Sequence, residues 1–142
     1  MPSERPMLDT YRYITPITTR WMDNDIYGHI NNVAYYSFFD TAANRFLIER
    51  GGLDIAAAPV IGLVVESKCE YHAALTYPEP LRAGVRVDKL GNRAVTYGIA
   101  IFSEHDDRAA AHGYFVHVFV DRVTRLPAPI PDPLRAALES LV

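Results

Sequence analysis

The sequence predicts an α+β fold in which a five-stranded antiparallel sheet wraps around one long helix. The first observation is a segment of helical periodicity that begins at residue 33. The second is the presence of one extended segment before that helix and four after it, most of them alternating between apolar and polar residues. A long helix followed by a run of strands is typical of α+β domains, and wrapping the sheet around the helix is the simplest way to bury it.

The first strand is predicted between Tyr11 and Trp21. One face of this segment carries Tyr13, Thr15, Ile17 and Thr19, and the other carries Thr18 and Arg20. Pro16 interrupts the segment and has no N–H to offer a neighbouring strand. The strand is therefore expected at the edge of the sheet or at an irregularity.

A polar loop containing Gly28 leads from this strand into the helix. The apolar face of the helix carries Tyr35, Phe39, Ala42 and Phe46, with Tyr36, Ala43 and Leu47 beside them and Ser37, Thr41 and Asn44 on the other side. The width of this face predicts that the helix is largely buried. Asn31 or Asn32 is expected to cap the start of the helix, and Gly51-Gly52 to end it.

Four extended segments follow the helix, over residues 60–74, 81–88, 94–101 and 114–121. Gly91-Asn92 and the polar stretch 104–108 are turn signals, so the last three segments are expected to form an antiparallel meander. Prolines between residues 127 and 133 end the sheet. Asp132 is expected to cap a short closing helix, with Pro133 at its first position.

The composition fits one globular domain, so we expect residues 1–142 to fold as a single unit. A net charge of -3 gives no indication of nucleic-acid binding. Cys69 is the only cysteine, so no internal disulfide can form, and no apolar run approaches the ~20 residues that span a membrane. We therefore expect a cytoplasmic protein that binds neither nucleic acid nor a membrane.

The segment from Asp25 to Asn32 has the clearest chemical content. It places a carboxylate, the permissive Gly28 and the unpaired N–H groups of a helix start close together in the chain. A helix start favours negative charge, so it can hold the oxyanion that forms when a carbonyl is attacked. Asp25 could attack that carbonyl or activate a water against it. A thioester suits such a weak catalyst, because sulfur donates little resonance to the carbonyl and the thiolate leaves well.

Each residue of this segment also has an ordinary structural role. The alternatives are a turn or cap for Asp25, a satisfied structural histidine for His29, helix caps for Asn31 and Asn32, and a core position for Tyr35. Asp23 and Asp25 could form a metal-binding pair, but His/Asp clusters with ligand spacing are otherwise missing from the sequence, so no metal is expected. The residues alone leave the catalytic and structural interpretations open.

The segment from Trp21 to Asp40 resembles the signature of the 4-hydroxybenzoyl-CoA thioesterase-like family of hotdog proteins. That signature runs aspartate, two variable residues, glycine-histidine-valine-asparagine-asparagine, then a tyrosine and an acidic residue on the helix; Ile30 replaces the valine here. The resemblance continues in order through Glu70-Tyr71, Pro80-Leu81, residues 117–121, Thr124 and Ile130-Pro131. It therefore covers nearly the whole chain.

This resemblance implies an acyl-CoA thioesterase with the hotdog fold, assembled as a homodimer or a dimer of dimers, with active sites at the dimer interface. It implies that Asp25 is the nucleophile or general base and that a backbone N–H near Asn32 holds the oxyanion. The oxyanion and substrate-binding set beside Asp25 is Gly28, His29, Asn31, Asn32 and Tyr35. No cofactor is expected, because coenzyme A is part of the substrate.

The CoA phosphates call for cationic side chains or backbone donors. Arg82, Arg86 and Arg122 are candidates, although each is more often a solvated strand or turn residue. The turn from Lys89 to Arg93, with Gly91 at its centre, is the preferred site. A basic tight turn at the end of a strand offers both charge and backbone donors.

Three other functions stay open. The first is hydrolysis of acyl groups from an acyl-carrier protein, which uses the same loop but should need a clustered basic rim. The second is a hotdog hydratase or dehydratase, which uses an aspartate and a histidine on the catalytic loop. The third is an acyl-binding protein without activity. The histidine-asparagine-asparagine version of the motif is common among long- and medium-chain acyl thioesterases, but the sequence does not settle whether the acyl group is aryl or alkyl.

Overall fold

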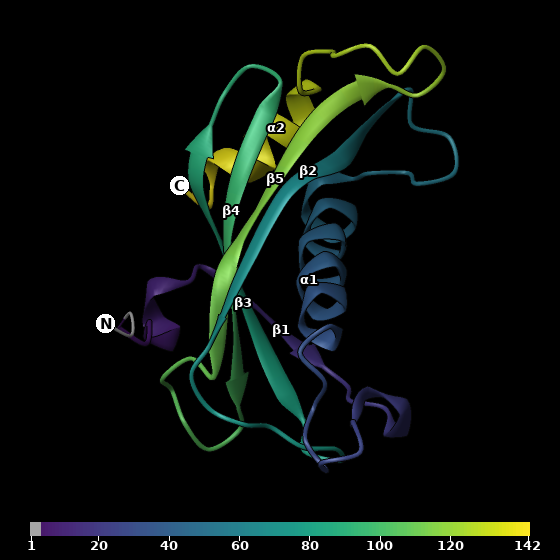
Figure 1. Cartoon of the computed structure of the whole chain (residues 1–142). Coiled ribbons are helices and arrows are strands. Elements are labelled where there is room, and N and C mark those ends of the chain that lie inside the picture. Colours follow the sequence, from purple (N-terminus) through teal and green to yellow (C-terminus); the bar gives the residue numbers. More distant parts are fainter. Residues whose placement is uncertain (1–3) are drawn as a thin grey trace.

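A five-stranded antiparallel sheet and one long helix make up most of the structure (Figure 1). The computed structural model describes residues 4–142. Its elements in chain order are η1 (Leu8–Thr10), β1 (Tyr13–Ile17), η2 (Trp21–Asp23), α1 (Ala34–Gly51), β2 (Val60–Tyr71), β3 (Leu81–Leu90), β4 (Ala94–Ser103), β5 (Ala111–Asp121) and α2 (Asp132–Glu139). This arrangement confirms the predicted α+β class and the hotdog fold.

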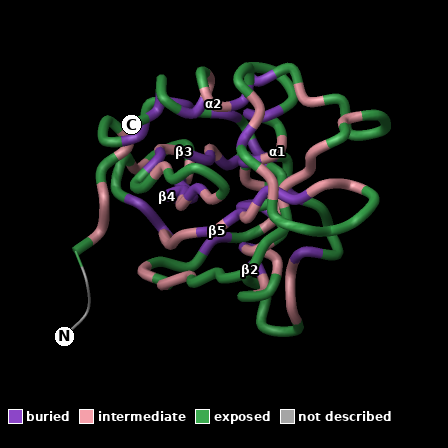
Figure 2. The backbone as a smooth tube through the Cα atoms, turned by 90° about the horizontal axis from the view of Figure 1, so that it is seen from above, coloured by how far each residue is buried: buried purple, intermediate pink, exposed green. Residues whose placement is uncertain are grey.

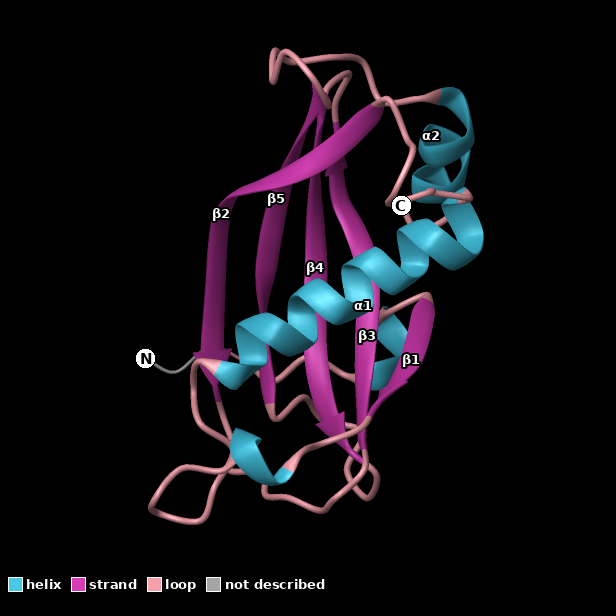
Figure 3. Cartoon of the chain, turned by 90° about the vertical axis from the view of Figure 1, so that its right-hand side faces the viewer, coloured by secondary structure: helices cyan, strands magenta, loops and turns pink. Residues whose placement is uncertain are grey.

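The strand order in the sheet is β1-β3-β4-β5-β2. β3, β4 and β5 are neighbours in chain order and pair antiparallel, which confirms the predicted meander. The two strands that flank α1 in the sequence, β1 and β2, occupy the two edges of the sheet. The helix therefore crosses one face of the sheet on its way from one edge to the other (Figure 3).

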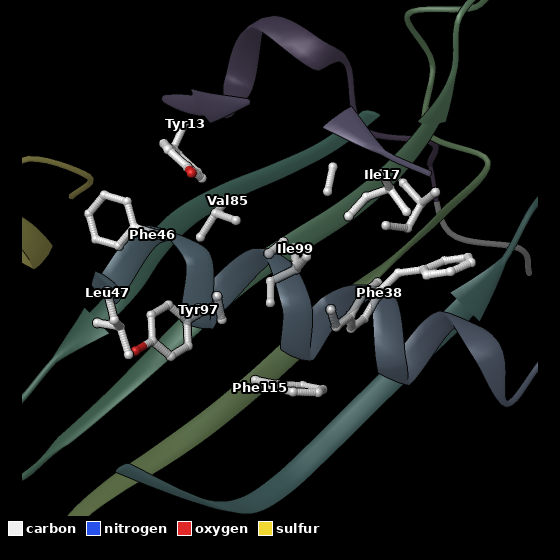
Figure 4. Close-up of a cluster of buried hydrophobic side chains, with 14 of the residues drawn as sticks. Tyr13, Ile17, Phe38, Phe46, Leu47, Val85, Tyr97, Ile99 and Phe115 are labelled. Carbon is white, nitrogen blue, oxygen red and sulfur yellow. The ribbon is translucent and has the colours of Figure 1, made fainter. Parts of the chain in front are cut away.

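The core lies between α1 and the strands that it crosses. Phe39, Ala42 and Phe46, on the predicted apolar face of the helix, are completely buried. Figure 4 shows side chains of α1 facing residues of the central strands such as Tyr97 and Ile99, which are also completely buried. Fully burying one large apolar side chain contributes about 1.5–3 kcal/mol, so this contact holds the helix to the sheet.

Burial is uneven across the sheet. The middle strands are mostly buried, whereas no residue of β2 belongs to the buried class (Figure 2). Leu63, Val64 and Val65 leave 37%, 45% and 60% of their surface exposed. An exposed apolar edge strand of this length is the kind of surface that proteins pair or cover.

The first strand is shorter than the predicted segment 11–21 and spans Tyr13–Ile17. Its alternation of buried and exposed residues is as expected, and Pro16 lies in an edge strand. The chain leaves the sheet early because the Asp23 carboxylate accepts the backbone N–H of Arg20 at 2.7 Å. This contact bends residues 21–23 into a short 3-10 helix.

The predicted strand 60–74 ends at Tyr71. The N–H groups of His72 and Ala73 both donate to the carbonyl of Ala110, at 2.8 and 3.1 Å, and this doubled contact ends the ladder with β5. Residues 72–74 therefore form a loop.

Both helices begin slightly differently from the expectation. Neither Asn31 nor Asn32 occupies the N-cap of α1; Val33 does, and no side chain caps it. The Asn31 Oδ1 instead accepts the N–H of Val33, the N-cap residue itself, at 3.3 Å. The end of α1 is as predicted, since Gly52 has the left-handed φ of 68°.

In α2, Asp132 is the first helical residue and not its cap. Pro131 holds the N-cap position in an extended conformation, and its carbonyl accepts the N–H of Arg135 at 2.9 Å. Pro133 therefore follows the first helical position by one residue. A run of alternating prolines leaves such one-residue differences open, because several of its residues fit the first turn of a helix.

One buried polar pair lies inside the aromatic core. The Nδ1 of His117 is 3.1 Å from the hydroxyl of Tyr97, and both side chains are almost inaccessible to solvent. Burial disfavours the charged imidazolium and lowers the pKa of His117 to about 4. The side chain is therefore neutral at pH 7.

The His117 pKa makes the fold sensitive to acid. An unfolded histidine has a pKa of about 6.5, so the unfolded chain binds a proton that the folded chain does not as the pH falls from there to about 4. The free energy of unfolding should fall over that window, by roughly 3 kcal/mol at its lower end. His117→Gln does not titrate and can still pair with Tyr97. Denaturant unfolding between pH 7.5 and 4.5 should show that the free energy of unfolding falls less steeply with pH in this variant than in the wild type.

The exposed His105 supplies the control, because His105→Gln should leave the pH dependence unchanged. If the free energy of unfolding of the His117→Gln variant fell as steeply with pH as that of the wild type, this buried histidine would not be the cause of the acid sensitivity.

Candidate active site

The segment from Asp25 to His29 forms a tight loop that is closed by its own backbone. The N–H of Asp25 donates to the carbonyl of His29 at 2.9 Å, and the N–H of Gly28 donates to the carbonyl of Asp25 at 3.1 Å. Gly28 has a φ of 83°, a conformation that side chains disfavour, so the glycine of the motif is needed for this turn. These contacts define the backbone of the loop that carries the Asp25 side chain.

The Asp25 carboxylate has one oxygen engaged. Its Oδ1 accepts the N–H of Tyr27 at 2.8 Å, which holds the carboxylate in one orientation. Within residues 4–142, no other hydrogen bond or ion pair involves this side chain. The second oxygen therefore stays available to a substrate or a water, and the side chain is half-buried.

Two neighbouring contacts fasten the loop to the segment that follows β2. The N–H of Ile30 donates to the carbonyl of Leu75 at 2.8 Å. The hydroxyl of Thr76 donates to the carbonyl of Gly28, also at 2.8 Å. Thr76 was not among the predicted site residues. Its role depends on a contact between segments far apart in the chain, which a single sequence does not reveal.

The backbone around Asn32 lies at the start of α1. The carbonyl of Asn32 accepts the N–H of Tyr35 at 3.4 Å and the hydroxyl of Tyr71 at 2.9 Å. The N–H of Asn32 donates to no acceptor in the part of the chain that the structure describes. This free donor lies at the positive end of the helix dipole, where a developing negative charge is stabilised.

A pocket of about 400 Å³ joins these groups. It is lined by Asp25, His29, Ile30, Asn32, Tyr35, Tyr71, His72, Ala73 and Ala74. The structure thus brings four of the predicted site residues to one cavity. Gly28 and Asn31 shape the backbone around it but do not line it, and the wall formed by residues 71–74 was missed.

Tyr35 contributes an apolar wall to this pocket. The side chain is buried, and burial raises the pKa of its phenol to about 12, so it stays protonated. Its ring meets the ring of Tyr71 edge to face, with centroids 5.1 Å apart. Both structural and functional interpretations of Tyr35 are therefore compatible with its position.

The structure does not bring the basic turn 89–93 to this pocket within one chain. β3 begins close to the pocket and runs away from it, so the turn lies at the other end of the sheet, beside α2 (Figure 1). Arg135 of α2 donates to the carbonyl of Gly91 and holds the turn there. Lys89 lines a separate hollow on the sheet together with Glu66 and Tyr114.

The fold and the loop before the helix define a hotdog-fold enzyme of the thioesterase class. The chain belongs to the Thioesterase-like superfamily, whose family model matches residues 19–138. This family consists of thioester hydrolases, so the chemistry expected from the motif agrees with the family. Among proteins with curated functions, none matches the chain.

Solved structures show the same fold. The PA5185 protein from Pseudomonas aeruginosa is 55% identical, with a TM-score of 0.95 and 96% of each chain covered. A 1,4-dihydroxy-2-naphthoyl-CoA thioesterase from Synechocystis is 16% identical, covers 91% of this chain and 96% of its own, and has a TM-score of 0.81. A DHNA-CoA thioesterase from Staphylococcus aureus is 24% identical, with 82% and 78% covered and a TM-score of 0.74. At these identities, the last two establish likeness of fold alone.

Residues 4–142 contain no group of three or more His, Cys, Asp or Glu side chains placed to hold a metal ion. They also contain no helix that is long and apolar enough to cross a membrane.

Proposed function

We propose that this protein hydrolyses acyl-CoA thioesters to a free acid and CoA, with Asp25 as the nucleophile or general base. The observation that carries the proposal is the pocket in which a carboxylate with a free oxygen and the unpaired N–H of Asn32 meet. A thioester carbonyl between the two would have its oxygen on the donor and its carbon open to attack. Such donors contribute a few kcal/mol to lowering the barrier.

Two routes fit this geometry. In the first, an oxygen of Asp25 adds to the carbonyl carbon, the C–S bond breaks, and water then hydrolyses the mixed anhydride. In the second, Asp25 removes a proton from a water as that water adds to the carbon. In both, negative charge develops on the carbonyl oxygen beside the Asn32 N–H, and the departing CoA thiolate takes up a proton.

The exposed edge strand supports a dimer. Pairing two copies of β2 side by side would cover Leu63, Val64 and Val65 and remove one edge from each sheet. The motif loop lies at the Tyr71 end of β2, so the partner would also lie against the pocket. The exposed apolar side chains of Trp21 and Ile26 would gain cover there. We propose a homodimer, or a dimer of dimers, in which the pocket is completed by the second copy.

In a two-fold dimer, the basic turn of one copy could lie near the pocket of the other copy. If the two β2 strands pair antiparallel, the α2 end of one copy lies at the Asp25 end of the other. The turn with Lys89, Gly91 and Arg93 would then lie at the same end of the joined sheet as the partner's pocket. We keep these three residues as the proposed contact for the CoA phosphates. No cofactor is part of this proposal, and the proposed location is the cytoplasm.

The remaining functions can be separated by their products. An acyl-carrier-protein thioesterase would prefer an acylated carrier to the matched acyl-CoA. A hydratase or dehydratase would change the double bond of the acyl chain without releasing thiol, and an acyl-binding protein would release none. Following free thiol across a panel of alkyl and aryl acyl-CoAs therefore tests the function and measures the acyl preference.

Asp25→Asn tests the catalytic assignment. Asparagine has nearly the same shape and can still accept the N–H of Tyr27, but it is neither a base nor a useful nucleophile. We expect kcat to fall by about a hundredfold or more with the fold preserved. Steady-state thiol release, normalised to folded protein, measures this. Asp9→Asn, an exposed aspartate in η1 outside the motif, is the matched control. Near-normal turnover of folded Asp25→Asn would rule out the assignment.

Two variants at position 32 test the backbone donor. The side chain of Asn32 makes no hydrogen bond in the described chain, so Asn32→Ala should change stability by less than about 0.5 kcal/mol and keep most of the activity. Asn32→Pro removes the N–H and should lower kcat by about a hundredfold. Thermal unfolding of both variants must be measured as well, so that each kcat can be expressed per folded molecule. Equal turnover per folded molecule in the two variants would exclude a role for this N–H.

Assembly is tested by placing a charge on the exposed edge. Val65→Lys would set two like charges close to the axis of the proposed dimer, so this variant should be monomeric and lose activity. Ile14→Lys is the control, because Ile14 is 40% exposed but lies in β1, at the opposite edge of the sheet. Light scattering at micromolar concentration measures the mass. A wild-type monomer that hydrolyses acyl-CoA would contradict the proposed assembly.

A further inference from the structure

A tyrosine from the edge strand holds the start of α1. The hydroxyl of Tyr71, the last residue of β2, donates to the carbonyl of Asn32 at 2.9 Å. That carbonyl belongs to the peptide after the Cα of Asn32, and the free N–H belongs to the peptide before it; Asn32 itself lines the pocket. Because the two peptides share this Cα, a contact that restrains the carbonyl from outside the helix also limits how the N–H can turn. Packing of the Tyr71 ring against Tyr35 fixes the phenol in place.

The two residues that flank Tyr71 in the chain are linked to each other by side-chain contacts. The Nε2 of His72 lies 2.7 Å from the Nδ1 of His112 on β5, and the Nε2 of His112 lies 3.3 Å from a carboxylate oxygen of Glu70. Glu70 and His72 flank Tyr71 directly in the chain, and His112 is the register partner of Glu70. The two residues around Tyr71 are thus tied to the same imidazole of the adjacent strand.

The protonation states of these side chains follow from their geometry. An ionised Glu70 can only accept, so a neutral His112 would turn its Nε2–H toward that carboxylate and keep a lone pair on Nδ1. In this tautomer, the Nε2–H of His72 can donate to that lone pair. Burial is the main cause that lowers the pKa of His112, with His72, Arg86 and Lys68 acting in the same direction and Glu70 opposing them. The lowered pKa of His112 favours the neutral ring, which is the form that this set of contacts uses.

Resting on the proposed function, we infer that Tyr71 is a positioning residue for thioester hydrolysis, which aims the Asn32 N–H at the substrate carbonyl, and that Glu70, His112 and His72 hold Tyr71 for this task. The hydroxyl of Tyr71 is already engaged by the protein, so it acts through Asn32 and does not touch the reacting atoms. Loss of this contact therefore changes the rate of the chemical step and leaves substrate affinity almost unaltered.

Tyr71→Phe removes only the hydroxyl and keeps the ring against Tyr35. We expect kcat for acyl-CoA hydrolysis to fall about tenfold, the effect of one hydrogen bond, with KM within about twofold of the wild type. Tyr13→Phe is the matched control, since the Tyr13 hydroxyl also reaches from an edge strand to α1, bonding Glu49 at 3.1 Å at the far end of the helix. This control should keep the wild-type kcat. An unchanged kcat in Tyr71→Phe, or a rise in KM alone, would overturn the inference.

His72 variants test the supporting chain. His72→Ala should lower kcat like Tyr71→Phe, and the double variant should be no slower than Tyr71→Phe alone, because both changes release the same contact. His72→Gln should recover most of the rate, since the amide can still donate to His112. If the losses of kcat from the two single variants multiply in the double variant, His72 does not act through Tyr71.

A readout without turnover separates this inference from the proposed function. In the free protein, the ¹⁵N resonance of Val33, whose peptide contains the Asn32 carbonyl, should shift in Tyr71→Phe and in His72→Ala but not in Tyr13→Phe. If the wild type hydrolyses no acyl-CoA, the proposed function fails while this shift still reports the contact. An unshifted Val33 resonance in Tyr71→Phe would refute the positioning role itself.

Discussion

Burial of one face of α1 against the sheet is the interaction on which the rest of the structure depends. Phe39, Ala42 and Phe46 have no exposed surface, and they fix both the position and the rotation of the helix. Once the helix is fixed, its start lies beside the end of β2, where the hydroxyl of Tyr71 reaches the carbonyl of Asn32. The loop before the helix and the segment after β2 then meet, and the pocket forms between them. The chemistry of the site is therefore a consequence of how the core holds the helix.

The site itself depends on a backbone group that the fold leaves without a partner. Most backbone donors in a folded protein are satisfied, and a free N–H beside a pocket is a group available to a ligand. The N–H groups on either side of it are satisfied, because Asn31 donates to the carbonyl of Asp23 and Val33 donates to the Oδ1 of Asn31, whereas the N–H of Asn32 has no acceptor in the described chain. Asp25 stands beside it with one carboxylate oxygen free. In the proposed mechanism, the fold thus brings an attacking group and an oxyanion donor to one pocket.

The sequence predicted the parts of the structure that repeat and missed those that depend on single contacts. The helix face and the meander followed from periodicity, because burial of one face imposes the same spacing along the whole element. The early end of β1 depends on one buried aspartate, Asp23, and the end of β2 on the doubled contact at Ala110, neither of which has a periodic signal. At the site, the motif identified Asp25 and Asn32, while Tyr71 and Thr76 are brought there by the fold. The predicted CoA turn lies at the far end of the same chain, which sequence order could not reveal.

In the proposed mechanism, the thioester lies between Asp25 and the N–H of Asn32. The most direct test is a crystal structure of Asp25→Asn with an acyl-CoA bound. The thioester oxygen should lie about 2.7–3.1 Å from the Asn32 nitrogen, with the carbonyl carbon facing residue 25. An acyl group bound elsewhere, such as in the hollow beside Lys89, with the Asn32 N–H left to solvent, would contradict it.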